Sequence, residues 1–385
     1  MFLIQSFMTL KTGINLFAIN QQDILYFISH KQTLVPYLVI EKLQAVNDLL
    51  IESRIKSKET LYSLKASILD KLGIYETHDT YYLPNYLSVK DLFGRLIGDT
   101  NFANLILLNE LKQLSKRLFK GSNVNRFFVP SKLLKASTLE EFDDILASYI
   151  PLFGETKQGK GLKQFNSYLF LSDYSRINTA FLNISFLEHI KEQLGSKVIV
   201  LVRDIVSLLN KRFIEFIDLA ILSAQLSYIP YPGFFVFIKK GIVKESNMRL
   251  VNKKDELFPL YALDILIDNV KANFDSIKKK RAELNNLFIS LIDKYINVDV
   301  TNPLLVPFNI LNAQDDRFIT VFSISAEFGD FLKRNASHSR VFIDINALKQ
   351  KRYRFVFSLG LYNNKDDVKD LVEYVRVSAH MLGLV

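Results

Sequence analysis

Short apolar runs alternate with longer amphipathic stretches along the first two thirds of the chain. Uninterrupted apolar runs, which are typical of buried strands, lie at residues 105–108, 127–129, 168–171 and 198–202. Apolar residues recur at three- and four-residue spacing elsewhere, which predicts helices over residues 36–50, 58–72, 138–149 and 185–194. Strands separated by helices form repeated β-α-β units. The pattern therefore predicts an α/β fold with a mostly parallel sheet and flanking helices.

The last third of the chain shows a different order of elements. An amphipathic stretch over residues 260–295 predicts a long helix with at most one break. Strands at 318–325, 341–345 and 354–359 follow, with helices at 326–336 and from 365 onward. We therefore expect a large α/β domain over 1–255, a bridging helix over 256–295 and a small α+β domain over 296–385. The short N-terminal segment is expected to pack on the small domain.

One stretch, 218–241, carries the clearest chemical signal. It reads D-L-A-I-L-S-A-Q-L-S-Y-I-P-Y-P-G-F-F-V-F-I-K-K-G, which is two apolar runs joined by a proline- and glycine-rich turn. It resembles the cofactor-lysine segment of the class V aminotransferases, in particular their cysteine desulfurase branch. In that family a strand beginning with Asp leads into Ser-Gly-His-Lys, and the lysine forms a Schiff base with pyridoxal phosphate. Asp218, Ser223 and Pro230 match, but Gln225 and Leu226 stand where the histidine and the lysine belong.

A second match lies near the C-terminus, where the chain reads F-S-L-G-L-Y-N-N-K-D-D-V-K-D-L-V. This is similar to the family ending R-x-S-x-x-x-Y-N-T-x-E-E. The arginine that binds the substrate carboxylate in the family falls at Val356, and Arg354 lies one pleat earlier on the same strand face. The family's catalytic cysteine would lie shortly upstream, but this chain has no cysteine.

The remaining positions implied by the resemblance have also changed. Bulky residues replace the family's Gly-Thr-Thr phosphate loop, no histidine is found at 109–115 where one stacks on the cofactor ring, and an arginine replaces the aspartate that pairs with the pyridinium nitrogen. A one-residue bulge would restore an aspartate there. The altered pocket positions are Asn85, Tyr86, Leu87, Arg203, Asp204, Val206, Gln225 and Leu226. Lys31, with His30 beside it on a loop expected to face the cofactor, is the candidate for a displaced Schiff-base lysine.

Composition narrows the classes of function further. Without cysteine there are no disulfides, thiolate metal sites or cysteine nucleophiles. The five histidines are scattered, which argues against a zinc site, and 14 glycines are few for a protein that cradles a phosphate. A net charge of +9 permits binding to nucleic acid, although the lysines are spread along the chain.

No signal peptide or membrane span is expected, so the sequence is interpreted as cytoplasmic. The uncharged run over 219–238 has about the length of a membrane span, about 20 residues. However, Pro230, Pro232 and Gly233 near its centre favour a turn.

The resemblance implies a fold like that of the pyridoxal phosphate transferases, with a seven-stranded type of sheet. The leading hypothesis is a cysteine desulfurase-like protein that has lost the cofactor lysine and the catalytic cysteine. It would bind no cofactor and act in sulfur or iron–sulfur metabolism as a homodimer, or as a heterodimer with an active desulfurase paralogue. One alternative is a divergent pyridoxal phosphate enzyme that uses a shifted lysine. Another is a basic α/β protein that binds nucleic acid.

Overall fold

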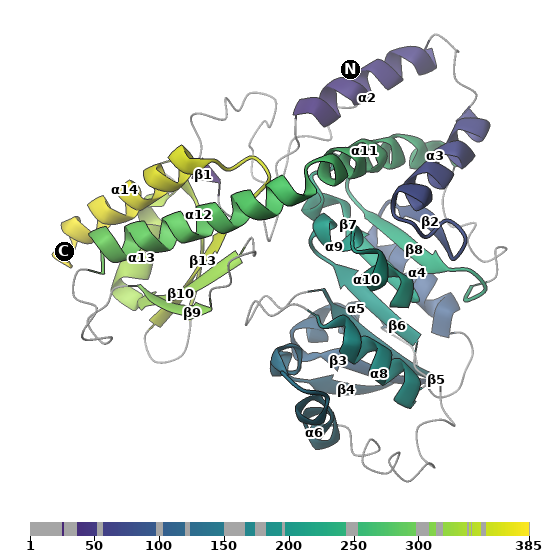
Figure 1. Cartoon of the computed structure of the whole chain (residues 1–385), viewed down its shortest axis with the longest axis horizontal. Helices are drawn as coiled ribbons and strands as arrows, with labels where there is room; N and C mark the ends of the chain where they lie inside the picture. The colour runs from purple at the N-terminus through teal and green to yellow at the C-terminus, as the bar shows by residue number, and fades with distance from the viewer. Residues whose placement is uncertain are drawn as a thin grey trace. The chain divides into compact units, whose positions relative to one another are not determined.

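The computed structural model describes most of the chain, and Figure 1 shows its helices and strands. The described residues are 25–26, 37–51, 57–97, 103–119, 124–149, 166–173, 182–194, 197–243, 253–297, 308–312, 319–336, 339, 341–347 and 352–384. The chain divides into two compact units. The large unit comprises Tyr37–Lys271, and the small unit comprises Met1–Pro36 together with Ala272–Val385.

The large unit is built on a seven-stranded sheet with the order β2-β8-β7-β6-β5-β3-β4. Its strands are β2 (His78–Leu83), β3 (Ala103–Leu108), β4 (Val124–Val129), β5 (Asn166–Ser172), β6 (Lys197–Val202), β7 (Leu219–Ser223) and β8 (Phe234–Lys239). Strands β4, β3, β5, β6 and β7 are mutually parallel, whereas β8 runs antiparallel to both β7 and β2. The expected α/β class and mostly parallel sheet are confirmed. The uncharged run over 219–238 forms β7, a turn and most of β8.

Helices accompany these strands along the chain. They are α2 (Tyr37–Ile51), α3 (Ser57–Lys71), α4 (Tyr86–Ile97), α5 (Lys112–Leu118), α6 (Leu139–Tyr149), α8 (Ile184–Leu194), α9 (Ile205–Leu208), α10 (Lys211–Phe216) and α11 (Lys253–Ala272), with short 3-10 turns η2 (Asn109–Leu111), η3 (Ser131–Lys135) and η5 (Ala224–Leu226). In Figure 1, α8 and α10 lie in front of the sheet.

The central parallel strands β6 and β7 are apolar along both faces, as is typical of strands that helices cover on both sides. On one face, Phe93 of α4 packs edge-on against Phe119, with ring centroids 4.9 Å apart, and lies 5.8 Å from the ring of Phe170 in β5. The Tyr168 hydroxyl, two residues earlier on β5, donates to the carbonyl of Leu96 at the end of α4. This contact satisfies a buried hydroxyl and joins the helix to the strand.

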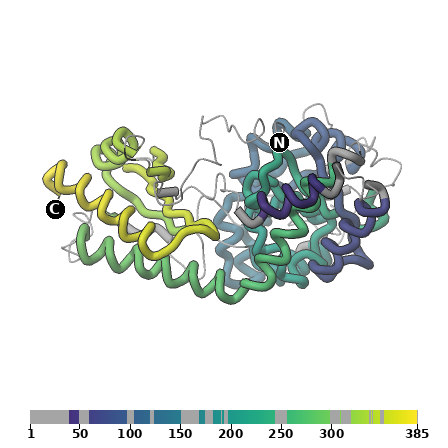
Figure 2. Tube along the Cα trace, turned by 90° about the horizontal axis from the view of Figure 1, so that it is seen from above, coloured from purple at the N-terminus to yellow at the C-terminus, as the bar shows by residue number. Residues whose placement is uncertain are grey.

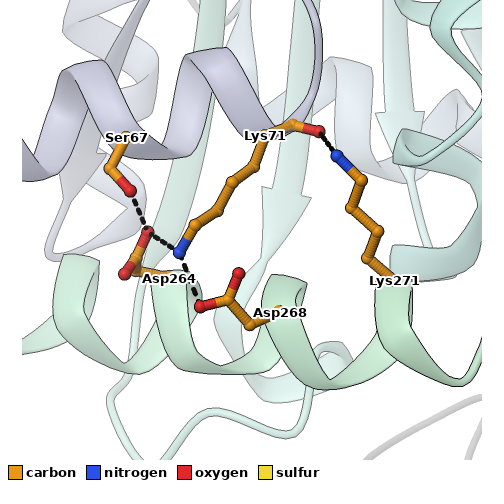
Figure 3. A network of polar contacts seen from close by, with 5 residues as sticks. All are labelled: Ser67, Lys71, Asp264, Asp268 and Lys271. Carbon is orange, nitrogen blue, oxygen red and sulfur yellow. Dashed lines mark hydrogen bonds and ion pairs between the residues drawn. The ribbon is translucent and has the colours of Figure 1, made fainter.

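A polar network joins α3 to α11 (Figure 3). The Lys71 ammonium donates to carboxylate oxygens of Asp264 and Asp268, each 2.7 Å away, and the Ser67 hydroxyl donates to the same Asp264 oxygen at 3.0 Å. The Lys271 ammonium donates to the backbone carbonyl of Lys71 at 2.9 Å. Burial by itself would lower the pKa of Lys71, but its hydrogen bonds to the two aspartates raise it overall.

The small unit has an antiparallel sheet with the order β12-β13-β10-β9 and a separate parallel pair, β1 with β11. These strands are β1 (Leu25–Tyr26), β9 (Asn309–Asn312), β10 (Ile319–Ser325), β11 (Val341–Phe342), β12 (Asp344–Ala347) and β13 (Arg352–Ser358). The helices are α12 (Phe274–Tyr295), α13 (Ala326–Ala336) and α14 (Lys365–Met381). The pairing of β1 with β11 ties Leu25 and Tyr26 to this unit.

Helices α12 and α14 lie side by side in the small unit, as both Figure 1 and Figure 2 show. The ring of Phe288 in α12 stacks on that of Phe357 in β13, with centroids 4.1 Å apart and planes 5° apart. Asn364 caps the N-terminus of α14 by accepting the backbone N–H groups of Asp366 and Asp367. The helix expected over 260–295, with at most one break, is broken once, because Asn273 separates α11 from α12.

Within the described ranges, no helix is both long enough and apolar enough to cross a membrane.

Candidate functional site

The carboxyl ends of the parallel strands meet at one edge of the large sheet. Strand β3 ends at Leu108, β5 at Ser172, β6 at Val202 and β7 at Ser223. In open α/β sheets this is the edge at which ligands bind, because the loops that follow the strands leave a crevice there. The residues that follow these four strands therefore form the candidate site. We call this group of residues the carboxyl edge.

The segment between β7 and β8, where the cofactor lysine is expected from the resemblance, is a turn closed by its own backbone. The N–H of Ala224 donates to the carbonyl of Gly233 at 3.0 Å, and the N–H of Ile229 donates back to the Ala224 carbonyl at 3.3 Å. Gln225 is exposed and Leu226 is half-buried. No lysine occurs anywhere in 224–233.

Strand β6 leads into Arg203, whose side chain is buried rather than solvated. Its Nε donates to the Ser172 hydroxyl at 2.7 Å, and its Nη2 lies 3.5 Å from Oε1 of Glu110 in η2. The side chains of Arg203 and Glu110 are each only 6% exposed. A buried guanidinium thus joins the carboxyl ends of β3, β5 and β6.

Asp173, directly after β5, is a buried acid of the carboxyl edge. Its carboxylate accepts the backbone N–H groups of Arg203 and Asp204, each at 3.0 Å, and the Ser207 hydroxyl at 3.0 Å. Burial raises the pKa of Asp173 to about 7, and the neighbouring Asp204 adds to the rise, while the two N–H donors act in the opposite direction. Burial of Asp173 thus opposes the ionised form that its three hydrogen-bond donors favour.

Asp204 and Val206, the two pocket positions that follow Arg203, lie at the start of α9. The Asp204 carboxylate accepts the N–H of Val206 at 3.2 Å, which makes Asp204 the N-cap of that helix. Both residues are buried. Any pairing of Asp204 with a ligand would have to compete with this capping bond.

The expected phosphate positions lie at the start of α4. The Asn85 side chain accepts the backbone N–H of Ser88 at 3.0 Å and thereby caps the helix. The ring of Tyr86 is half-buried and meets that of Phe234 edge-on at 6.0 Å. Leu87 is 69% exposed. Of these two bulky residues, only Tyr86 has a side chain that is partly buried in the protein.

Three sequence-predicted positions remain, which are Arg354, His30 and Lys31. Arg354 is half-buried on β13 of the small unit, paired in register with Ser323 and Asn346. His30 and Lys31 lie outside the described residues.

Sequence reasoning missed Glu110, Ser172 and Asp173. A signal existed for Ser172 and Asp173, because polar residues that directly follow a buried apolar strand reach this edge of a parallel sheet. Nothing in the sequence distinguished Glu110 from a solvated acid. The described residues contain no group of three histidines and acids placed to hold a metal ion.

Pyridoxal phosphate, as the resemblance describes its binding, needs an amine after β7, an anion beside the pyridinium nitrogen and free N–H groups at a helix N-terminus. The turn 224–233 supplies no lysine, the residue after β6 is the cation Arg203, and Asn85 already caps α4. The described residues of the carboxyl edge therefore do not fit this cofactor in the family's manner.

Comparisons with known proteins support the fold. No protein-family model and no curated protein matches the sequence. Among solved structures, a NifS-like protein from Rickettsia africae matches with a TM-score of 0.63 at 13% identity, over 93% of this chain and 99% of that chain. A variant of SPT with PLP matches with a TM-score of 0.61 at 11% identity, over 85% of this chain and 78% of that one.

The 4-hydroxyphenylacetaldehyde synthase of Rhodiola rosea matches with a TM-score of 0.63 at 10% identity, over 93% of this chain and 83% of that one. At sequence identities this low, the structural similarity is evidence for the fold alone and not for the function. The seven-stranded, mostly parallel sheet with its small antiparallel companion is the fold of the fold type I enzymes that depend on pyridoxal phosphate.

Proposed function

We propose that this protein is a non-catalytic, cysteine desulfurase-like protein that acts by binding another protein. The observation that carries the proposal is the turn after β7. Leu226 stands at the position where the resemblance expects the Schiff-base lysine, and a leucine has no amine with which to form an imine. Backbone hydrogen bonds among Ala224, Ile229 and Gly233 hold the turn in a defined conformation.

The proposed setting is sulfur mobilisation for iron–sulfur clusters in the cytoplasm. It rests on the sequence resemblance to desulfurases and on the likeness of fold to a NifS-like protein. The proposed partner is a second copy of the chain or an active desulfurase paralogue. Burying an apolar face at a subunit interface stays favourable after the catalytic activity is lost, and 49% of the residues of this chain are hydrophobic. We expect an obligate type of interface, about 2,000 Å² or more.

Titration of the purified full-length chain with pyridoxal phosphate tests the loss of chemistry. The protein should remain colourless, and borohydride reduction followed by mass spectrometry should find no lysine that is labelled above the level of the exposed surface lysines. Stoichiometric labelling at Lys31 would instead establish the divergent enzyme with a shifted lysine and refute the proposal.

Light scattering at micromolar protein concentration tests the proposed partner. The expected result is a mass about twice the chain mass of 44.4 kDa. Alternatively, the chain should form a stable complex when mixed with an active desulfurase paralogue. A monomer that forms no such complex would remove the partner role.

A further inference from the structure

Arg203 is fixed from several directions at the carboxyl edge. The Ser172 hydroxyl accepts from its Nε at 2.7 Å, the Glu110 carboxylate lies 3.5 Å from its Nη2, and the Asp173 carboxylate accepts its backbone N–H at 3.0 Å. These partners come from η2 and from the end of β5. The arginine therefore holds the end of β6 to its neighbours on the side of β5 and β3.

The acids around this arginine are already committed to contacts within the chain. Asp204 caps α9 through the N–H of Val206, and Asp173 holds the backbone between β6 and α9. Swinging the guanidinium out of the edge would leave the Glu110 carboxylate buried without its cation. Breaking a buried ion pair in this way is strongly unfavourable.

We infer that Arg203 is the specificity-determining residue that keeps pyridoxal phosphate out of the carboxyl edge. This inference rests on the proposed function and names the residue that excludes the cofactor. Arg203 follows the strand after which the resemblance expects an aspartate beside the pyridinium nitrogen. A guanidinium there repels a protonated ring instead of stabilising it. Contacts with Ser172 and Glu110 fix the Arg203 guanidinium in place. The folded protein therefore excludes pyridoxal phosphate without any conformational change.

The test compares two variants that both carry an amine at position 226. The first is Leu226→Lys alone. The second is Leu226→Lys combined with Arg203→Met and Glu110→Gln, which removes both charges so that neither stays buried unpaired. Both are incubated with the same concentration of pyridoxal phosphate, reduced with borohydride and analysed by mass spectrometry. We expect at least tenfold more adduct at position 226 in the second variant.

A matched control makes the same chemical change away from the edge. The Arg212–Glu188 pair joins α10 to α8 on the surface, with 2.9 Å between Nη2 and Oε1. Leu226→Lys combined with Arg212→Met and Glu188→Gln should label position 226 no more than Leu226→Lys alone. Equal labelling of position 226 in the edge variant and the control, whether high or absent, would overturn the inference.

A second measurement uses the unaltered protein, so it holds even if the triple edge variant fails to fold. An arginine-selective dicarbonyl reagent should modify Arg203 at no more than a tenth of the rate of the exposed Arg212. Comparable rates would show that the clamp does not exist in solution and would overturn the inference.

The outcomes separate this inference from the proposed function. Covalent binding of pyridoxal phosphate by the unaltered chain at some other lysine would refute the non-catalytic function. The ratio of labelling between the edge variant and its control would still decide the role of Arg203.

Discussion

The guanidinium of Arg203 and the carboxylate of Glu110 form a buried ion pair, 3.5 Å apart, that links the end of β6 to η2 after β3. Glu110→Ala removes this carboxylate from beside the buried cation, whose Nε still donates to Ser172. We expect it to lower the free energy of unfolding by about 3–5 kcal/mol. The combined Arg203→Met and Glu110→Ala change should cost clearly less than the sum of the two single changes. Urea denaturation of the four proteins measures this coupling, and strictly additive losses would contradict the pairing.

The Lys71 network supplies a second prediction, for the packing of α3 against α11 (Figure 3). Lys71→Met removes the hydrogen bonds to Asp264 and Asp268. Because this group is 20% exposed, we expect the loss to be about 1–2 kcal/mol rather than that of a fully buried pair. Chemical denaturation measures the change. Lys369→Met, which removes an exposed pair with Asp366, is the control and should leave stability nearly unchanged.

Asp173 predicts a pH dependence of stability. Its pKa is raised from 3.8 to about 7 in the folded chain, chiefly by burial. The folded state therefore holds this proton to a higher pH than the unfolded state does. The contribution of Asp173 to stability is greatest below about pH 4 and declines as the pH rises to about 7, with a slope of at most about 1.4 kcal/mol per pH unit.

Asp173→Asn cannot ionise and should remove this decline. The measurement is the difference in unfolding free energy between the unaltered chain and the variant at several pH values from 4 to 8. The variant should gain relative stability as the pH rises through this window. A constant difference would mean that Asp173 titrates alike in the folded and unfolded chain.

Two glycines of the large unit should respond in opposite directions to alanine. Gly233 has a φ of +112°, and a Cβ there would collide with the carbonyl oxygen of Leu83. Gly233→Ala should therefore destabilise the protein by about 1–3 kcal/mol. Gly94 lies exposed within α4, and a Cβ there meets nothing within 4 Å, so Gly94→Ala should stabilise by about 0.5–1 kcal/mol. Thermal unfolding of the two variants checks the signs, and a Gly233→Ala variant as stable as the unaltered chain would contradict the assigned turn.

Local patterning predicted much of the fold because strands and helices impose periods on the sequence itself. The apolar runs at 105–108 and 198–202 lie within β3 and β6, and the polar turn after Ser223 separates β7 from β8. The helix expected over 260–295, with at most one break, is broken once, between α11 and α12 at Asn273. The apolar spacing did not locate that break.

The candidate site was only partly predictable. Leu226, Arg203 and Asn85 were identified from the sequence because each replaces a residue of a known motif. The sequence did not predict that Arg203 would be buried against Glu110 and Ser172, because these residues lie on three different strand ends. Partners far apart in the sequence leave no local periodicity from which their contact could be inferred.

The sequence by itself determined the α/β class, the positions of most strands and the lysine-free turn after β7, because these depend on residue identity and spacing within single segments. Only the tertiary structure decided what the altered pocket residues do. Parallel strands bring their carboxyl ends together, and the low exposure there requires every charge to find a partner. That requirement places Arg203 between Glu110 and Ser172 and turns Asp173 into a support for the backbone between β6 and α9.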